Sequence, residues 1–176
     1  MKLSYKALLL VCSCLLILFY SPVGASMFGL FKKYDVHLCP EVKGRILDHG
    51  KPVEGLVVKR WLFYVDEIER EDSVITDENG EFYFPEKNIK SKLPGRAFVE
   101  NLTRQAIYIE YQGTKLPLWR ATLFGYFKNS AFSKKLQDLN CDVNDPAVDF
   151  EFENPTGGLR HYANSICRWS DDFYIY

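Results

Sequence analysis

Residues 42–85 decide the fold, and they read VKGRILDHGKPVEGLVVKRWLFYVDEIEREDSVITDENGEFYFP. From Val42 to Ile46, small or apolar residues alternate with charged ones, which is the period-two pattern of a strand with one buried face. Residues 48–51 (DHGK) predict a turn, because the glycine can adopt a positive φ at no steric cost. Residues 56–65 (LVVKRWLFYV) are rich in β-branched and aromatic side chains and predict a long central strand.

The second half of this stretch predicts two more strands. Residues 66–72 (DEIERED) predict a charged connection, and a strand begins at Val74. Residues 77–80 (DENG) predict a tight hairpin turn, because Asn-Gly favours the positive φ values that such turns require. Residues 81–84 (EFYF) alternate in polarity, and Pro85 ends the strand that they form.

The rest of the chain continues the strand pattern, with one exception. Alternation predicts further strands at residues 105–112, 115–126, 148–153 and 159–169. The exception lies at residues 130–140.

Those residues have the spacing of a short amphipathic helix. Phe132, Leu136 and Leu139 follow the order i, i+4, i+7, with charged and polar residues between them. Ser130 is the expected cap at the start of this helix, and Asn140 is the expected end.

Together these segments predict a mostly β protein, a single antiparallel β-sandwich of about seven strands with one short helix. We expect the sandwich domain to cover residues 42–176, because no repeat, low-complexity stretch or linker divides them. Residues 26–41 are expected to lead into the domain, either packed on it or as a short mobile arm.

Residues 1–25 have the parts of a secretory signal peptide. Lys2 and Lys6 give a positively charged start, residues 7–20 form an apolar run, and small residues end the segment at Ala25. The run is shorter than the roughly 20 apolar residues that span a bilayer. We therefore expect cleavage near Ala25, a periplasmic or secreted protein, and no stable membrane span after cleavage. An uncleaved anchor is the alternative.

The charge balance bears on the partner. The chain has 22 basic and 23 acidic residues, and cleavage after Ala25 would remove two of its lysines. A mild acidic excess without a basic stripe argues against nucleic acid, whose phosphates require clustered cations. We expect another protein as the partner.

Three of the five cysteines lie beyond residue 25, and they are Cys39, Cys141 and Cys167. In an oxidising compartment two of them are expected to pair, and three pairings are possible. We favour Cys141–Cys167, since each borders a predicted regular element, with Cys39 left as a thiol or an intermolecular partner. The alternative is three reduced, buried cysteines.

The pieces of residues 42–85 resemble a known domain in their order and spacing. The first strand with Gly44, the turn at residues 48–51, the PVEG of residues 52–55 and the TDENGEF of residues 76–82 resemble the carboxypeptidase regulatory-like domain, a transthyretin-like β-sandwich. The resemblance implies a fold. It also implies an absence of catalytic residues, because this module is an accessory domain in its enzymes.

The later half of the chain extends this resemblance. With LNC at residues 139–141 and ICRW at residues 166–169, the whole chain is similar to a group of small exported bacterial proteins built around the module. The resemblance assigns no functional residue.

Two short patterns offer metal ligands, but neither forms a complete site. His37 and Cys39 stand two apart, and the spacing of the chain supplies no partners for a zinc site. Residues 77–81 carry three oxygen ligands, but the chain turns into a strand before the twelve-residue loop that calcium requires. GxSxG, HExxH and a glycine-rich phosphate loop are absent from the sequence. We expect no catalytic residues, no cofactor and no metal.

Aromatic residues are numerous, 27 of 176, and residues 115–126 carry them at both parities. A strand of period two cannot bury both sets unless it is covered on both faces. We therefore interpret Trp119, Phe124 and Tyr126 as a candidate interaction surface. The alternative is that these residues form core and cross-strand pairs.

These features favour a non-enzymatic exported protein-interaction module, either of the immunity or inhibitor type or an accessory factor. A structural or surface-adhesion module and a small-ligand binder are the alternatives.

Overall fold

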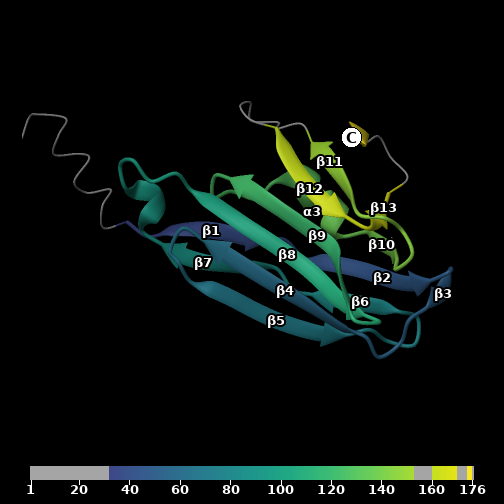
Figure 1. Cartoon of the computed structure of the whole chain (residues 1–176). Helices are drawn as coiled ribbons and strands as arrows, with labels where there is room; N and C mark the ends of the chain where they lie inside the picture. Colours follow the sequence, from purple (N-terminus) through teal and green to yellow (C-terminus); the bar gives the residue numbers. More distant parts are fainter. Residues whose placement is uncertain (1–31, 153–159, 170–173, 176) are drawn as a thin grey trace, which may run out of the picture.

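Strands make up most of the computed structural model, which describes residues 32–152, 160–169 and 174–175 (Figure 1). The predicted signal peptide, residues 1–25, lies outside the described residues. The strands are β1 (Tyr34–Cys39), β2 (Val42–Asp48), β3 (Lys51–Pro52), β4 (Val57–Tyr64), β5 (Glu69–Ile75), β6 (Glu81–Phe84), β7 (Lys87–Ser91), β8 (Leu102–Tyr111), β9 (Thr114–Phe124), β10 (Leu139–Asp142), β11 (Val148–Phe152), β12 (His161–Ser165), β13 (Cys167–Arg168) and β14 (Tyr174–Ile175). A 3₁₀ turn, η1 (Leu93–Gly95), and the helix α3 (Ser130–Leu136) complete the described elements. None of the described helical segments is long and apolar enough to cross a membrane.

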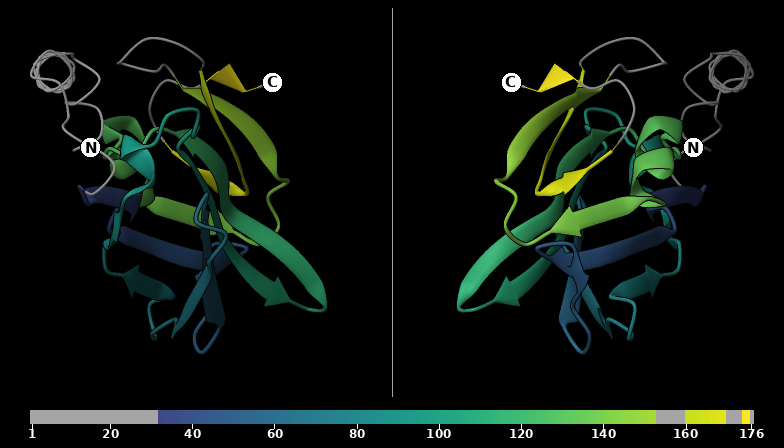
Figure 2. Two further views of the ribbon diagram at one scale, coloured as in Figure 1. Left: turned by 90° about the vertical axis from the view of Figure 1, so that its left-hand side faces the viewer. Right: turned by 90° about the vertical axis from the view of Figure 1, so that its right-hand side faces the viewer.

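Two layers of strands face each other across the core (Figure 2). One layer is a seven-stranded antiparallel sheet in the order β14-β11-β12-β9-β8-β4-β5. The other layer holds a five-stranded sheet, β13-β10-β2-β3 with β6 also paired to β2, and the two-stranded sheet of β1 and β7. The predicted mostly β, antiparallel sandwich with one helix is confirmed. Among the described strands one pair, β2 with β10, is parallel.

The alternation on β4 shows how the layers hold together. Val58 and Leu62 are buried and belong to one core cluster with Val36 of β1 and Ile46 of β2, in the opposite layer. Full burial of an aliphatic side chain of this size stabilises the fold by roughly 1.5–3 kcal/mol. The intervening residues of β4 point to the outer face of the seven-stranded sheet, and they include Trp61.

The turn at residues 48–51 joins β2 to β3 as predicted. His49 and Gly50 have φ values of 49° and 77°, which are the two positive values of a two-residue hairpin turn. The same geometry recurs between β8 and β9, where Gln112 and Gly113 have φ values of 49° and 79°.

The turn at residues 77–80 also forms, but the hairpin predicted around it is wrong. Its flanking strands lie in different sheets, because β5 pairs with β4 and β6 pairs with β2. Asp77 Oδ1 closes the turn by accepting hydrogen bonds from Asn79 N and Glu81 N. Gly80 has a φ of 74°, and a Cβ atom there would lie 2.4 Å from the carbonyl oxygen of Ile46. The turn therefore carries the chain from one layer of the sandwich to the other.

The charged connection predicted at residues 66–72 is shorter than expected, because β5 begins at Glu69. This strand is the edge of the seven-stranded sheet, and among the described strands it pairs only with β4. Acidic residues have a low intrinsic propensity for strands. Charged residues are nevertheless common on edge strands, where they oppose pairing with other chains. The pairing with β4 overrides the local preference.

The helix is shorter than predicted and begins with a different cap. Asn129, not Ser130, is the N-cap, and its side-chain oxygen accepts a hydrogen bond from Phe132 N. Leu139, which was expected to extend the apolar stripe of the helix, lies in β10 and is buried there.

The sandwich begins before the expected boundary at Val42. β1 lies inside the predicted lead-in segment, pairs with β7 and places Val36, Leu38 and Cys39 in the core. At the other end, the strand predicted at residues 159–169 is divided at Ile166, since β12 belongs to the seven-stranded sheet and β13 to the five-stranded sheet.

The predicted disulfide is confirmed. Cys141 of β10 and Cys167 of β13 are bonded and directly opposite each other on neighbouring antiparallel strands, with their Cα atoms 3.9 Å apart. Cys39 is a free, buried cysteine.

Candidate interaction surface

The three residues of the predicted surface lie in three different environments. Trp119 is fully buried, so its assignment to an interaction surface is wrong. Tyr126 is half-buried beyond the end of β9, where its ring packs on Tyr34 and Phe127. Phe124 is 40% exposed on the outer face of the seven-stranded sheet.

A β-bulge explains the burial of Trp119. Opposite β9, Ile107 pairs with Trp119 and Tyr108 pairs with Pro117, so Leu118 is the extra residue on the bulged strand. Leu118 and Trp119 are consecutive and both fully buried. The bulge therefore lets one face of the sandwich take apolar residues of both parities.

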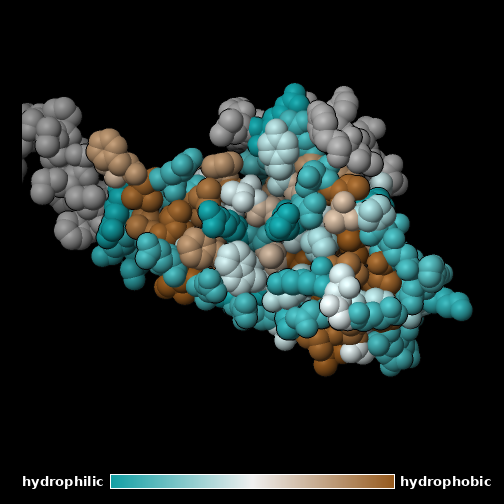
Figure 3. Space-filling view, viewed as in Figure 1, coloured by the Kyte–Doolittle hydropathy of each residue, from teal (hydrophilic) through white to brown (hydrophobic). Residues whose placement is uncertain are grey.

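The outer face of the seven-stranded sheet gathers aromatic residues from four strands. We call Trp61, Phe63, Tyr108, Phe124 and Tyr162 the aromatic face; they share one side because cross-strand partners point to the same face of a sheet. The Trp61 and Phe63 rings are stacked, with centroids 5.9 Å apart and planes 9° apart. Tyr162 is 58% exposed. Figure 3 views this side of the molecule, where paler residues lie among teal, hydrophilic ones over β4, β8 and β9.

Three residues of the aromatic face line a hollow of about 580 Å³. Small residues line it between the larger side chains, Ala106 of β8 and Thr122 of β9 among them. The three aromatic residues are Trp61, Phe124 and Tyr162. Tyrosine and tryptophan are the residue types that most often anchor protein interfaces.

Charged residues of both signs lie around the hollow, with basic residues in excess. Arg104, Arg120 and Arg160 line it, together with the carboxylate of Asp149. Asp149 accepts a hydrogen bond from Asn164 Nδ2 at 2.8 Å, and Arg160 is paired with Glu151 at 2.8 Å. Arg104 and Arg120 have no ion-pair partner in the part of the chain that the structure describes.

Sequence reasoning missed most of this surface. Arg104, Ala106 and Tyr108 alternate on β8, and Arg160, Tyr162 and Asn164 alternate at β12, so the composition of each strand was readable. The sequence did not predict which strands are neighbours in the sheet, because the register of distant strands leaves no local signal in one sequence.

A larger groove of about 790 Å³ lies on the other layer, beside β2 and β6. Its basic residues are already engaged: Lys43 pairs with Glu41 at 2.7 Å, and Arg45 Nε donates to the carbonyl oxygen of Asn79 at 2.9 Å. Tyr83 is the exposed aromatic residue among the side chains that line it. The aromatic face is the better candidate for recognition, because Arg104 and Arg120 have no ion-pair partner among the described residues and both Phe124 and Tyr162 are exposed.

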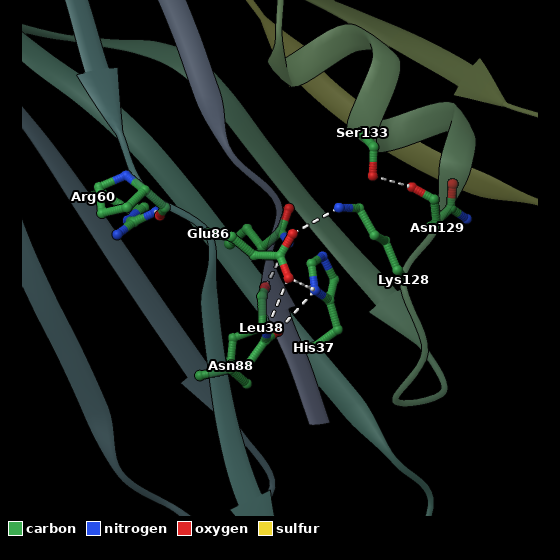
Figure 4. A network of polar contacts seen from close by, with 10 residues as sticks. His37, Leu38, Arg60, Glu86, Asn88, Lys128, Asn129 and Ser133 are labelled. Carbon is green, nitrogen blue, oxygen red and sulfur yellow. Dashed lines mark hydrogen bonds and ion pairs between the residues drawn. The ribbon is translucent and has the colours of Figure 1, made fainter. Parts of the chain in front are cut away.

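A polar network at β1 and β7 contains His37, one of the two metal candidates (Figure 4). His37 Nδ1 lies 2.9 Å from Asn88 Oδ1 and 3.7 Å from Glu86 Oε1, and Glu86 is paired with Lys128 at 2.6 Å. Burial lowers the pKa of His37, although Asn88 and Glu86 act in the opposite direction. Burial raises the pKa of the Cys39 thiol to about 12, so this thiol is protonated and unreactive at neutral pH.

Metal ligands do not gather elsewhere in the described residues. No group of three or more His, Cys, Asp or Glu residues of that part of the chain could hold a metal ion. The acidic pair Asp48 and Asp142 is occupied by hydrogen bonds, since Asp142 accepts from the backbone of Gly50 and both residues accept from Asn144. Although burial opposes the charged form, these bonds lower the pKa of Asp142 to about 2.

Arg60 is a fully buried charge that belongs to the fold. Its guanidinium donates two hydrogen bonds to Asp72 on β5, at 2.8 and 2.6 Å, and a third to the carbonyl oxygen of Pro85. It also lies over the Phe84 ring, with Cζ 4.7 Å from the centroid. This arrangement satisfies a charge that would otherwise be costly in the core.

Asp72→Ala is expected to lower the free energy of unfolding by about 2 kcal/mol, because it leaves the guanidinium without its counter-charge. The value is below the roughly 3–5 kcal/mol for breaking a fully buried pair, since the Asp72 side chain is 38% exposed and water reaches it. Urea unfolding followed by fluorescence measures it. Adding Arg60→Met to this variant should restore part of the lost stability. An Asp72→Ala variant whose free energy of unfolding is unchanged would contradict this account.

Comparison with known proteins places the chain in a family. The family described as "Domain of unknown function (DUF6795)" matches residues 42–146, which is more than half of the chain, and the chain belongs to this family. The matched range includes β4, β8 and β9, the centre of the aromatic face, and ends before β12. No curated protein and no solved structure matches the chain.

Proposed function

We propose that this chain, which belongs to the DUF6795 family, is an exported, non-enzymatic protein-interaction module that contacts its partner through the aromatic face of the seven-stranded sheet. The observation that carries the proposal is the hollow of about 580 Å³, lined by Trp61, Phe124 and Tyr162 with small residues between them. Exposed aromatic residues that cluster on one face are rarely kept without a use. An inhibitor of the immunity type or an accessory factor of the periplasm acts through such a contact.

Two further features support this function. The disulfide between Cys141 and Cys167 suits an oxidising compartment, as the predicted signal peptide does. The free thiol of Cys39 is buried and protonated, and therefore offers no nucleophile. The kinship with carboxypeptidase regulatory-like domains stays a prediction, and it too favours an accessory role over catalysis.

A small-ligand binder is the second candidate, and the size of the hollow favours it. Ligand sites in proteins commonly have volumes of about 300–1,000 Å³. They are usually enclosed, however, whereas this hollow lies on the open face of a sheet and is flanked by exposed Phe124 and Tyr162. An open, aromatic surface fits a protein partner better.

Site-specific photo-crosslinking in cells of the source organism tests the proposal. A photoreactive amino acid at the position of Phe124 or Tyr162 is expected to give a discrete adduct with another protein. The matched control is the position of Tyr83, which is 48% exposed on the opposite layer, compared with 40% for Phe124 and 58% for Tyr162. Adducts that form equally well at all three positions, or at none, would refute the proposed surface.

A further inference from the structure

The two central arginines of the hollow, Arg104 and Arg120, lie close together, and neither has an ion-pair partner among the described residues. Arg104 of β8 pairs with Thr122, and Arg120 of β9 pairs with Ala106, so the two arginines are diagonal neighbours on adjacent strands. Diagonal neighbours of a sheet are about 7–8 Å apart at the backbone, within reach of long side chains. Neither guanidinium has a carboxylate partner among the described residues. Two like charges at this spacing gain nothing for the fold from their proximity.

Glu69 and Glu71 of β5 lie on the same face, two strands away from Arg104. In the described part of the chain, neither they nor the carboxylates of β11 form an ion pair with Arg104 or Arg120. Asp149 is on the same cross-strand row as Arg120 but two strands away, and strands are about 4.8 Å apart. Asp149 is also already bonded to Asn164. Glu151, on the row of Arg104, accepts hydrogen bonds from Arg160 and Tyr162. The arginines are therefore available to an external anion.

Aromatic rings orient at least one of the two guanidinium groups. The Arg104 Cζ atom lies 5.8 Å from the centre of the Phe63 ring, which itself stacks on Trp61. A guanidinium held on an aromatic ring keeps its N–H donors in a fixed plane, which suits bidentate contact with a carboxylate. Apolar rings beside the charge also exclude water and strengthen such a contact.

We propose that the hollow binds an acidic segment of the partner protein, with carboxylates on Arg104 and Arg120 and apolar or aromatic side chains on Trp61, Phe124 and Tyr162. This proposal rests on the proposed function and specifies the chemistry of the partner. The charges that line the hollow, three arginines and one aspartate, sum to +2, whereas the net charge of the whole chain is −1. A volume of about 580 Å³ accommodates several side chains rather than a single carboxylate.

Peptide display against the oxidised protein tests this chemistry without knowledge of the natural partner. Selection from a random library is expected to enrich peptides that combine Asp or Glu with aromatic residues. A selected peptide should lose at least tenfold in affinity on Arg104→Ala or Arg120→Ala, measured by titration calorimetry, and less on Arg104→Lys, which keeps the charge without the planar fork. Arg96→Ala, at an exposed arginine outside the hollow, is the matched control and should change nothing.

The double variant Arg104→Glu/Arg120→Glu gives the sharpest test. It should no longer bind the acidic peptides and should instead select basic ones, while its thermal unfolding stays close to that of the original protein. Enrichment of neutral or basic peptides by the unmodified protein would overturn the proposal, and so would binding of polyuridylate or heparin that depends on Arg104 and exceeds that of the peptides. Crosslinks at Phe124 without any acidic enrichment would leave the proposed function standing and refute only the acidic partner.

Discussion

Trp119→Ala is expected to lower the free energy of unfolding by about 4 kcal/mol, within the usual range for removing a buried aromatic side chain. Trp119 is fully buried, and its ring packs edge-to-face on Phe132 and Trp169, at centroid distances of 5.0 and 6.2 Å. Its removal would leave a cavity between β9, the helix and the C-terminal strands, which a close-packed interior fills only in part. Urea unfolding monitored by far-ultraviolet circular dichroism measures the loss.

The indole N–H of Trp119 adds a polar component to this effect. It donates to Gln105 Oε1 at 3.0 Å, and Gln105 Nε2 in turn donates to the carbonyl oxygen of Leu38 at 2.7 Å. This chain of hydrogen bonds connects the seven-stranded sheet to β1 in the other layer. Trp119→Phe keeps most of the volume but leaves the Gln105 oxygen unpaired, so it should cost about 1–3 kcal/mol.

Phe124→Ala provides the contrast, five residues further along the same strand. Because Phe124 is 40% exposed, its truncation should change the free energy of unfolding by less than about 1 kcal/mol. This variant should bind the partner less well than the original protein, while its stability stays nearly the same. If both variants lost stability equally, Phe124 would be a packing residue and the aromatic face would lose one of its two exposed members, Phe124 and Tyr162.

Local patterns predicted the elements of the fold well wherever one face of a strand is buried. The β-branched and aromatic residues of 56–65 identified β4, and the glycine of residues 48–51 identified the first hairpin, because these preferences act within a few residues. The same reasoning failed at residues 77–80, where the turn formed but its strands entered different sheets. Whether two strands joined by a turn pair with each other depends on their side-chain contacts with distant strands, and this information is not local.

The candidate surface was predictable only in part. The sequence identified Phe124 because aromatic residues at both parities of one strand cannot all be buried when alternation is strict. Alternation was not strict, since the bulge at Leu118 lets Leu118 and Trp119 be buried in succession. Arg104 and Tyr162 became part of one surface only through the register of β8, β9 and β12, which no spacing in the chain encodes.

Reduction of the Cys141–Cys167 disulfide is expected to lower the free energy of unfolding by roughly 3.5 kcal/mol. The bond closes a loop between cysteines 26 residues apart, and a cross-link of this span removes that much conformational entropy from the unfolded chain in the loop-closure description. Unfolding in urea with and without a reductant measures the difference. The double variant Cys141→Ala/Cys167→Ala should be destabilised to a similar degree and should no longer respond to the reductant.

The free cysteine provides the control for this experiment. Cys39 is buried and its thiol has a pKa of about 12, so Cys39→Ala should keep the full response to the reductant. A response that disappeared in Cys39→Ala would mean that the reductant acts through a different bond, and the pairing of Cys141 with Cys167 would then not be the one formed in solution.

The place where stability is lost on reduction bears on the interaction surface. In the described part of the chain β13 pairs only with β10, and it continues directly from β12, which carries Tyr162 at the hollow. If the disulfide acts only through the unfolded state, amide exchange should accelerate equally in β8 and β12. If it also anchors the C-terminal strands, exchange in β13 and in the adjoining β12 should accelerate first, because a strand with one neighbour opens before the core does. We expect the second pattern, since β8 is held between β4 and β9 whereas β13 depends on one neighbouring strand and the covalent bond to it.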